Sequence, residues 1–171
     1  MYEFVKFEVT NNVALMTLNR PDNLNSWNQQ MRDELKSAVQ RVAGDDEIRV
    51  LVITGTGRAF SAGEDVRGMK GLTDLTTRGF RRVVRDIHNV FDELEAIEIP
   101  VIAAINGIAA GGGLEMALSC DFRFASNTAK MGFPENNVGL IPGSGGCSRL
   151  VKTVGLSTAK RLVMTGEMIP A

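Results

Sequence analysis

The sequence contains little cysteine and no strong excess of charge. Its two cysteines, Cys120 and Cys147, have the spacing of neither a disulfide framework nor a zinc motif. A reducing compartment, the cytoplasm, is therefore expected. The formal net charge is −1, from 19 basic and 20 acidic residues, which disfavours nucleic acid or a membrane surface as the partner.

Long hydrophobic runs and histidine are also scarce. The longest apolar runs, such as "VIAAI", are far too short to cross a bilayer, and the amino-terminal "MYEFVKFEVTNN" predicts a strand and not a signal or transit peptide. The single histidine, His88, lies in an amphipathic helical pattern that is more typical of a helix surface than of a catalytic base. Enzymes built on a Ser–His or Cys–His pair are accordingly disfavoured.

The composition that remains is that of an ordinary globular domain. Of the 171 residues, 44% are hydrophobic and 23% are charged. A chain of this length can bury a substantial core without disulfides or metals. The sequence therefore predicts one domain with its own hydrophobic core.

Hydrophobic periodicity predicts alternating strands and helices. An apolar pattern on both sides of "TNN" predicts a β-hairpin over 2–9 and 13–18. Helical spacing predicts a helix that buries Met31, Leu35, Ala38, Val39 and Val42, with Asn25 or Ser26 as its cap. The other predicted elements are strands at 48–55, "VIAAING" and "DFRFA", and helices over 80–94, from "GGGLEMALSC", over 144–153 and over 157–165. This alternation predicts an α/β fold with right-handed crossovers between parallel strands.

Two glycine-rich loops follow predicted buried strands, in "VLVITGTGRAFSAGED" and "VIAAINGIAAGGGLE". Unpaired N–H groups at such turns and helix starts can bind an anion or a developing oxyanion. Close packing of helix on sheet accounts for the glycines equally well. Neither G-x-G-x-x-G nor G-x-x-x-x-G-K-[ST] is present at "GIAAGGGLEM", and "IPGSGGCS" has Pro142 where a hydrolase motif needs glycine.

Two glutamates stand near these glycines. Glu115 lies one turn into the helix that "GGG" opens, and Glu135 follows Pro134, whose ring restricts the backbone. Two carboxyl groups around one cavity can divide acid and base work. The alternative is that Glu115 is a charge favoured by the helix dipole and Glu135 a surface cap.

Several stretches together resemble the crotonase superfamily, specifically enoyl-CoA hydratase. They are "LNRPDNLNSWNQQMRDEL", "AFSAGEDVRGM", "IPVIAAINGIAAGGGLEMALSCDFRFAS" and "KMGFPENNVGLIPGSGGCSRL", in the family's order and over essentially the whole chain. The resemblance implies a ClpP/crotonase-type spiral of ββα repeats, a homotrimer or a dimer of trimers, and an acyl-CoA thioester as substrate. It places a single crotonase core domain at 1–171, without the C-terminal helices that build the trimer in longer members.

The resemblance also implies roles for individual residues. The backbone N–H groups of Glu64 and Gly112 would form an oxyanion hole for the thioester carbonyl. Glu115 would activate the water that attacks C3, and Glu135 would deliver a proton to C2. No metal or redox cofactor is implied, since CoA is part of the substrate. For Trp27, the alternative to a substrate contact is a core aromatic. The residues implied to contact the substrate are Asn25, Ser26, Trp27, Arg58, Ala62, Gly63, Asp65, Val66, Arg67, Gly111 and Pro134.

The sequence departs from the family in two places. It stops after "TGEMIPA", where family members continue, so we expect an exposed apolar face through which the chain associates. Asn136 and Asn137 stand where apolar residues are expected, which affects the acyl pocket. The alternatives to a hydratase are a Δ3,Δ2-enoyl-CoA isomerase that uses chiefly Glu135, another crotonase-type reaction such as carnitine-thioester racemisation or aromatic acyl-CoA hydration and cleavage, and a non-catalytic acyl-CoA-binding subunit.

Overall fold

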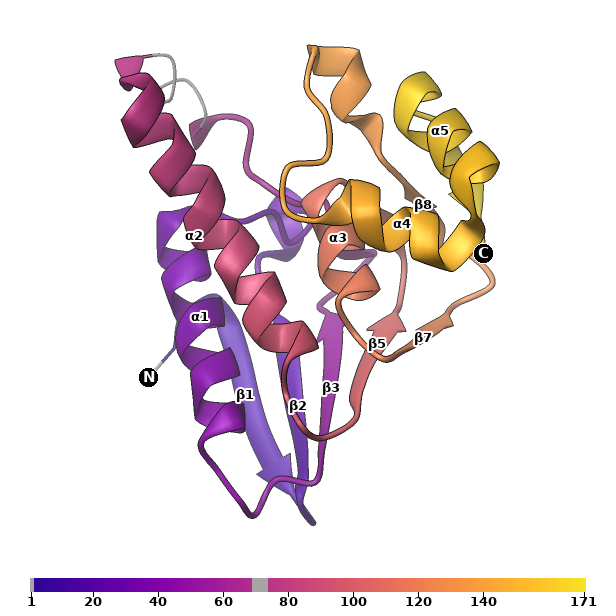
Figure 1. Ribbon diagram of the computed structural model, residues 1–171. Coiled ribbons are helices and arrows are strands. Elements are labelled where there is room, and N and C mark those ends of the chain that lie inside the picture. The colour runs from indigo at the N-terminus through magenta and orange to yellow at the C-terminus, as the bar shows by residue number, and fades with distance from the viewer. Residues whose placement is uncertain (1, 69–73) are drawn as a thin grey trace.

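A computed structural model describes residues 2–68 and 74–171 (Figure 1). Met1 and Met69, which belong to two of the stretches quoted above, lie outside this description. The strands are β1 Val5–Thr10, β2 Val13–Leu18, β3 Val50–Gly55, β4 Ala59–Ser61, β5 Val101–Ile105, β6 Ile108–Ala110, β7 Phe122–Ala125, β8 Lys130–Gly132 and β9 Met168–Pro170. The α-helices are α1 Gln29–Ala43, α2 Thr77–Glu95, α3 Gly112–Leu118, α4 Gly146–Val154 and α5 Leu156–Thr165, and the 3₁₀ turns include η1 Pro21–Asn23 and η3 Pro134–Val138.

The described strands form two sheets. The larger has the order β1-β2-β3-β5-β7 and the smaller has the order β4-β6-β8-β9. β1 and β2 are the predicted hairpin, joined by Asn11 and Asn12 with φ of 50° and 66°, the left-handed pair that a tight two-residue turn favours. From β2 to β7 the neighbours in the larger sheet are parallel, which confirms the α/β class.

A repeating order of two strands and a helix builds the rest of the molecule. It runs β3-β4-α2, then β5-β6-α3, then β7-β8-α4, with the first strand of each unit in the larger sheet and the second in the smaller. The predicted succession of ββα units is thus confirmed. Sequence analysis missed β4, β6, β8 and β9 because each has three residues, too few for any periodicity to register. They are strands because they pair with segments far away in the chain.

The predicted helices are present, but the start of α1 differs from the prediction. Its cap is Asn28, whose side chain accepts from the N–H of Met31 at 2.9 Å, and not Asn25 or Ser26. The side chain of Asn25 is fully buried and bonds instead to the backbone of the preceding turn and of the β3–β4 connection. The prediction failed because Asn is equally suited to cap a helix and to bridge loops.

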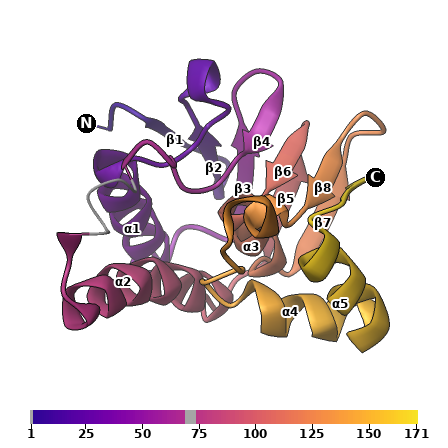
Figure 2. The same cartoon turned by 90° about the horizontal axis from the view of Figure 1, so that it is seen from above.

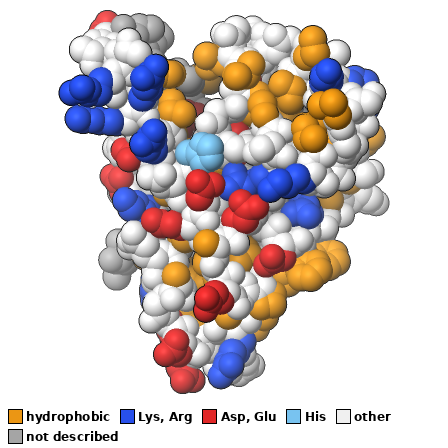
Figure 3. Space-filling model, viewed as in Figure 1, with side chains coloured by type: hydrophobic (Ala, Val, Ile, Leu, Met, Phe, Trp, Pro, Cys, Tyr) orange, Lys and Arg blue, Asp and Glu red, His pale blue; other side chains and the backbone are white. Residues whose placement is uncertain are grey.

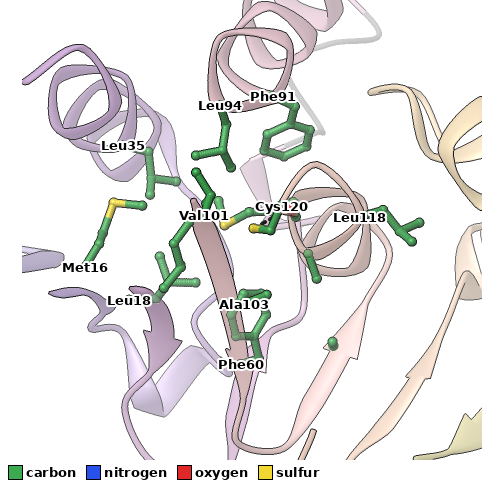
Figure 4. Packing of buried hydrophobic residues seen from close by; sticks show 14 of the residues in the cluster. Met16, Leu18, Leu35, Phe60, Phe91, Leu94, Val101, Ala103, Leu118 and Cys120 are labelled. Carbon is green, nitrogen blue, oxygen red and sulfur yellow. Dashed lines mark hydrogen bonds between the residues drawn. The ribbon is translucent and has the colours of Figure 1, made fainter. Parts of the chain in front are cut away.

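The hydrophobic core lies between the larger sheet and the helices. Figure 2 shows α1, α2 and α3 on the same side of the strands. In Figure 4, Phe91 and Leu94 of α2 reach toward Val101 of β5, and Leu35 of α1 lies beside them. Burial of this cluster fixes α2 against α1.

Other apolar side chains stay exposed. Val138, Ile141, Leu156 and Met164 are between 59% and 71% exposed, and Figure 3 shows hydrophobic side chains gathered over η3 and α5. This agrees with the exposed apolar face expected from the sequence. In the described part of the chain, no helix combines the length and apolar character needed to cross a membrane.

Candidate active site

Two glycine loops meet at one edge of the smaller sheet. They follow β4 and β6, which are parallel neighbours, and not β3 and β5 as the sequence suggested. Gly63 has φ of +81°, and a Cβ added to it would lie 2.7 Å from the Gly112 nitrogen. A Cβ on Gly113 would lie 2.2 Å from the Ser61 carbonyl oxygen. The two loops therefore touch backbone to backbone, an approach that only glycine permits.

Two backbone N–H groups at this contact, those of Glu64 and Gly112, are the candidates for the predicted oxyanion hole. Gly63 N–H donates to Ser61 Oγ at 3.0 Å and Asp65 N–H donates to the Trp27 carbonyl at 3.0 Å. No acceptor for the intervening Glu64 N–H occurs among the described residues. The same holds, within residues 2–68 and 74–171, for the Gly112 N–H at the start of α3, where helix N–H groups lack partners.

Trp27 forms a wall of this region. Its backbone N–H donates to the Gly63 carbonyl at 2.8 Å, so that Trp27 and Glu64 form a parallel β-bridge. A Cβ on Gly112 would lie 2.9 Å from the edge of the indole ring. The ring is 1% exposed and packs edge-on against Phe91 with centroids 5.5 Å apart. Trp27 is thus a core aromatic that also abuts the predicted oxyanion hole.

Glu115 is held at the centre of the site. It is 3% exposed, and its Oε1 accepts from the N–H groups of Ser144 at 2.7 Å and Gly146 at 2.8 Å. Burial raises the pKa of Glu115, and these two hydrogen bonds act against that rise. The charges of His88 and Arg149 also lower the pKa of this carboxyl group. Glu115 is therefore a buried, oriented carboxyl group and more than a helix-start charge.

Glu135 lies on the other side of the glycine backbone. A Cβ on Gly111 would lie 2.9 Å from Glu135 Oε1. Its Oε2 is buried and has no hydrogen-bond partner among the described atoms. Burial, with the nearby charge of Glu115, raises the pKa of Glu135 to about 7. Burial raises the pKa of the Cys147 thiol, and the charges of Glu115 and Glu135 add to this rise.

The altered pKa of Glu135 gives a testable expectation about stability. A carboxyl group whose pKa is raised on folding contributes most to stability when it is protonated. For Glu135 this contribution is complete below the ordinary glutamate pKa of 4.5 and is lost as the pH rises through about 7. Glu135→Gln should therefore raise the melting temperature more at pH 8 than at pH 5, since glutamine is neutral at both. Calorimetry of this variant beside Glu93→Gln, an exposed glutamate of α2, checks it. An equal change at both pH values would contradict the expectation.

Besides Trp27, five of the eleven predicted substrate-contacting residues belong to these loops or adjoin Glu135. Ala62, Gly63, Asp65 and Gly111 lie on the two loops, and Pro134 directly precedes Glu135 in η3. Asp65 is largely buried and pairs with Arg20 and Arg67.

The other predicted contacts are either exposed or buried beneath these loops. Val66 is 63% exposed and Arg67 is also on the surface. Arg58 is exposed at the opposite end of β4, and Asn25 and Ser26 are buried beneath the loop. The side chain of Asn25 is engaged by the protein itself.

The residues that hold Glu115 were not predicted from the sequence. Ser144 and Gly146 act through backbone N–H groups, and the only sequence signal for them is "PGSGG" before a predicted helix, which as a hydrolase motif lacks a glycine.

Arg32 of α1 pairs with Glu64, whose pKa is raised by burial. Asn136 donates to the Met164 carbonyl at 2.6 Å, so this unexpected asparagine ties η3 to α5. Among the described residues, no cluster of three His, Cys, Asp or Glu suits a metal ion.

Comparison with known proteins agrees with this architecture. The family model for enoyl-CoA hydratase/isomerase matches residues 8–171. Crotonyl-CoA hydratase of Syntrophomonas wolfei is 42% identical over 99% of this chain and 65% of its own length. Short-chain-enoyl-CoA hydratase of Clostridium acetobutylicum is 40% identical over 98% of this chain and 63% of its own length. The crystal structure of enoyl-CoA hydratase from Bacillus anthracis superposes with a TM-score of 0.91 at 36% identity, over 99% of this chain and 65% of that one.

The ββα units and the meeting of two glycine loops define a crotonase-type fold, as the superposition confirms. The chain belongs to the enoyl-CoA hydratase/isomerase family. It spans less than two thirds of the length of these relatives.

Proposed function

We propose that this chain carries the reaction centre of an enoyl-CoA hydratase, which adds water across the C2=C3 bond of a 2-enoyl-CoA to give a 3-hydroxyacyl-CoA. The observation that supports this most is the placement of the two carboxyl groups. Glu135 lies beside Gly111, and Glu115 of the following helix is close enough for its charge to raise the pKa of Glu135. The relatives named crotonyl-CoA hydratase and short-chain-enoyl-CoA hydratase support the same chemistry.

The proposed mechanism assigns the thioester carbonyl oxygen to the N–H groups of Glu64 and Gly112. Negative charge develops on this oxygen as water attacks C3, and each donor aimed at it typically lowers the barrier by about 3–4 kcal/mol. The backbone contact between Gly63 and Gly112 brings the two donors into the same region.

The two carboxyl groups have separate proposed tasks. Glu115, as the carboxylate, accepts a proton from the water whose oxygen forms the new bond to C3. Glu135, which has a pKa of about 7, is substantially protonated at neutral pH and donates its proton to C2. The reaction leaves Glu115 protonated and Glu135 ionised, and transfer of one proton between them restores the starting state. The reaction requires no metal or redox cofactor.

The experiment that tests this proposal is the addition of crotonyl-CoA to the chain, with loss of the conjugated enoyl-thioester absorbance as the readout. A hydratase consumes this absorbance and produces 3-hydroxybutyryl-CoA, which mass spectrometry identifies by the gain of one water. Absence of turnover overturns the proposal. Calorimetric titration with a saturated acyl-CoA then distinguishes a binding subunit from a chain that does not bind CoA thioesters.

An isomerase is the second candidate. Moving a double bond from C3 to C2 needs one group that removes and returns a proton near neutral pH, and the pKa of Glu135, about 7, suits that task. A 3-enoyl-CoA substrate distinguishes the two activities, because an isomerase generates the conjugated absorbance that a hydratase removes.

The proposed assembly is a homo-oligomer, a trimer or hexamer. The apolar side chains exposed over η3 and α5 would associate to remove their surface from water. We expect light scattering to give a mass above that of the monomer, and the double variant Leu156→Ser, Met164→Ser to reduce it. Leu75→Ser, at a less exposed apolar position before α2, is the control. A monodisperse monomer would contradict the expectation.

A further inference from the structure

Arg149, near the start of α4, is a buried arginine with an unusual set of partners. Its side chain is 6% exposed. Its Nη2 lies 2.6 Å from Asp92 Oδ1 and its Nε donates to Glu95 Oε2 at 2.8 Å, both on α2. These carboxylates are 55% and 49% exposed, so they reach inward from the surface to the guanidinium. The remaining bond goes inward, from Nη1 to the Ser144 carbonyl oxygen at 3.0 Å.

The bond to Ser144 acts on the segment that holds Glu115. The N–H groups that donate to Glu115 belong to Ser144 and Gly146, in the peptide units on either side of the Ser144 carbonyl. Fixing this carbonyl fixes the orientation of the peptide unit between the two donors.

Gly145 makes the contact between Arg149 and the Ser144 carbonyl possible. It has φ of +93°, and a Cβ at this position would lie 2.0 Å from Arg149 Nη1. Only glycine both adopts this backbone and leaves room for the guanidinium. The conformation of the segment and the position of Arg149 are thus matched to each other.

We infer that Arg149 is a positioning residue for Glu115: anchored on α2 by Asp92 and Glu95, it holds the 144–146 segment so that two N–H groups point at the Glu115 carboxylate. Its consequence for catalysis rests on the proposed function, whereas the geometric role does not. A purely structural tie between α2 and α4 would affect the ionisation of Glu115 only through the charge of Arg149, which Arg149→Lys retains.

The ionisable groups around Glu115 come from three elements. They are His88 of α2, Cys147 and Arg149 of α4, and Glu135 of η3. Arg149 favours the ionised form of Glu115 twice, through its charge and through the two N–H donors that it orients. Removal of Arg149 should therefore leave Glu115 harder to ionise.

The test is a carbon-13 NMR titration of the glutamate carboxyl groups in the complete 171-residue chain. In Arg149→Met we expect the titration midpoint of Glu115 to rise by about one pH unit or more. The amide proton signals of Ser144 and Gly146 should move upfield as their bonds to the carboxylate weaken. Arg149→Lys, which keeps the charge but not the planar fork, should give a smaller rise.

Two further variants complete the test. Asp92→Asn with Glu95→Gln removes the anchor from the half-exposed side and should raise the Glu115 midpoint in the same direction, so the inference stays testable if Arg149→Met does not fold. Arg161→Met removes an arginine that pairs with Glu167 on the surface, and it should leave Glu115 unchanged.

An unchanged Glu115 midpoint in folded Arg149→Met overturns the inference. If Arg149→Met does not fold, an unchanged midpoint in Asp92→Asn with Glu95→Gln overturns it. Failure of the proposed function appears separately, as absence of turnover by the unaltered chain. Where that chain is active, Arg149→Met should lower kcat with little change in KM, because the glutamate and not the binding surface is disturbed.

Discussion

Replacement of Glu115 by glutamine is expected to lower the rate of crotonyl-CoA hydration by roughly 10²–10⁴-fold, the usual contribution of a general base. The amide oxygen of glutamine can still accept from the N–H groups of Ser144 and Gly146, so the side chain should keep its place. What glutamine cannot do is accept the proton of the attacking water. The loss should therefore appear in kcat, with a melting temperature no lower than that of the unaltered chain as evidence that the site is intact.

Glu135→Gln should cause a loss of similar size, because the proton donor for C2 is removed. If the two carboxyl groups serve one reaction, the double variant should lose much less than the product of the single losses. Glu93→Gln, an exposed glutamate of α2, should keep full activity. A single variant that retains more than about a tenth of the rate would contradict its assigned role.

The same variants separate hydration from isomerisation. An isomerase that uses chiefly Glu135 would lose activity toward 3-enoyl-CoA in Glu135→Gln and keep it in Glu115→Gln. A hydratase needs both residues. Equal loss in both variants, measured on the 2-enoyl substrate, therefore supports hydration.

The long elements of this fold could be predicted from the sequence because their burial repeats over many residues. The stripe through Met31 and Val42 identified α1, and the apolar runs identified β3 and β5. The three-residue strands of the smaller sheet could not be identified in this way. Their pairing joins segments that are distant in the sequence, so the information for them is spread over the whole chain.

The candidate site, like the fold, could be predicted only in part from the sequence. Glu115 and Glu135 could be proposed from their side chains, and the glycine loops from their composition. The groups that hold Glu115 could not, because Ser144 and Gly146 act through backbone N–H groups that every residue except proline has. The sequence also offered packing or function as equal explanations of the glycines. In the structure Gly63 and Gly113 allow close packing, and that packing is what places the candidate donor N–H groups at the site.

Gly63→Ala tests this link between packing and the proposed oxyanion hole. The new methyl group would lie 2.7 Å from the Gly112 nitrogen and 3.0 Å from the Ala110 carbonyl oxygen, both backbone atoms that cannot rotate away. The two loops must separate, so at least one N–H donor should lose its aim at the thioester oxygen. Loss of one such donor typically lowers kcat by about 10²–10³-fold. We expect a loss of that order in Gly63→Ala, measured with crotonyl-CoA on protein shown to be folded by circular dichroism.

Gly57→Ala provides a matched control for backbone strain. Gly57 has φ of +79°, close to the +81° of Gly63, so the backbone strain of alanine alone should cost about 1–2 kcal/mol of stability at either position. Its new methyl group, however, would make an ordinary contact with Pro21 Cβ at 3.4 Å and reach neither loop of the site. Both variants should therefore melt at a lower temperature, and only Gly63→Ala should lose its rate. Equal rates in the two variants would mean that the contact between the loops serves the fold alone, and that the oxyanion must be stabilised by other groups.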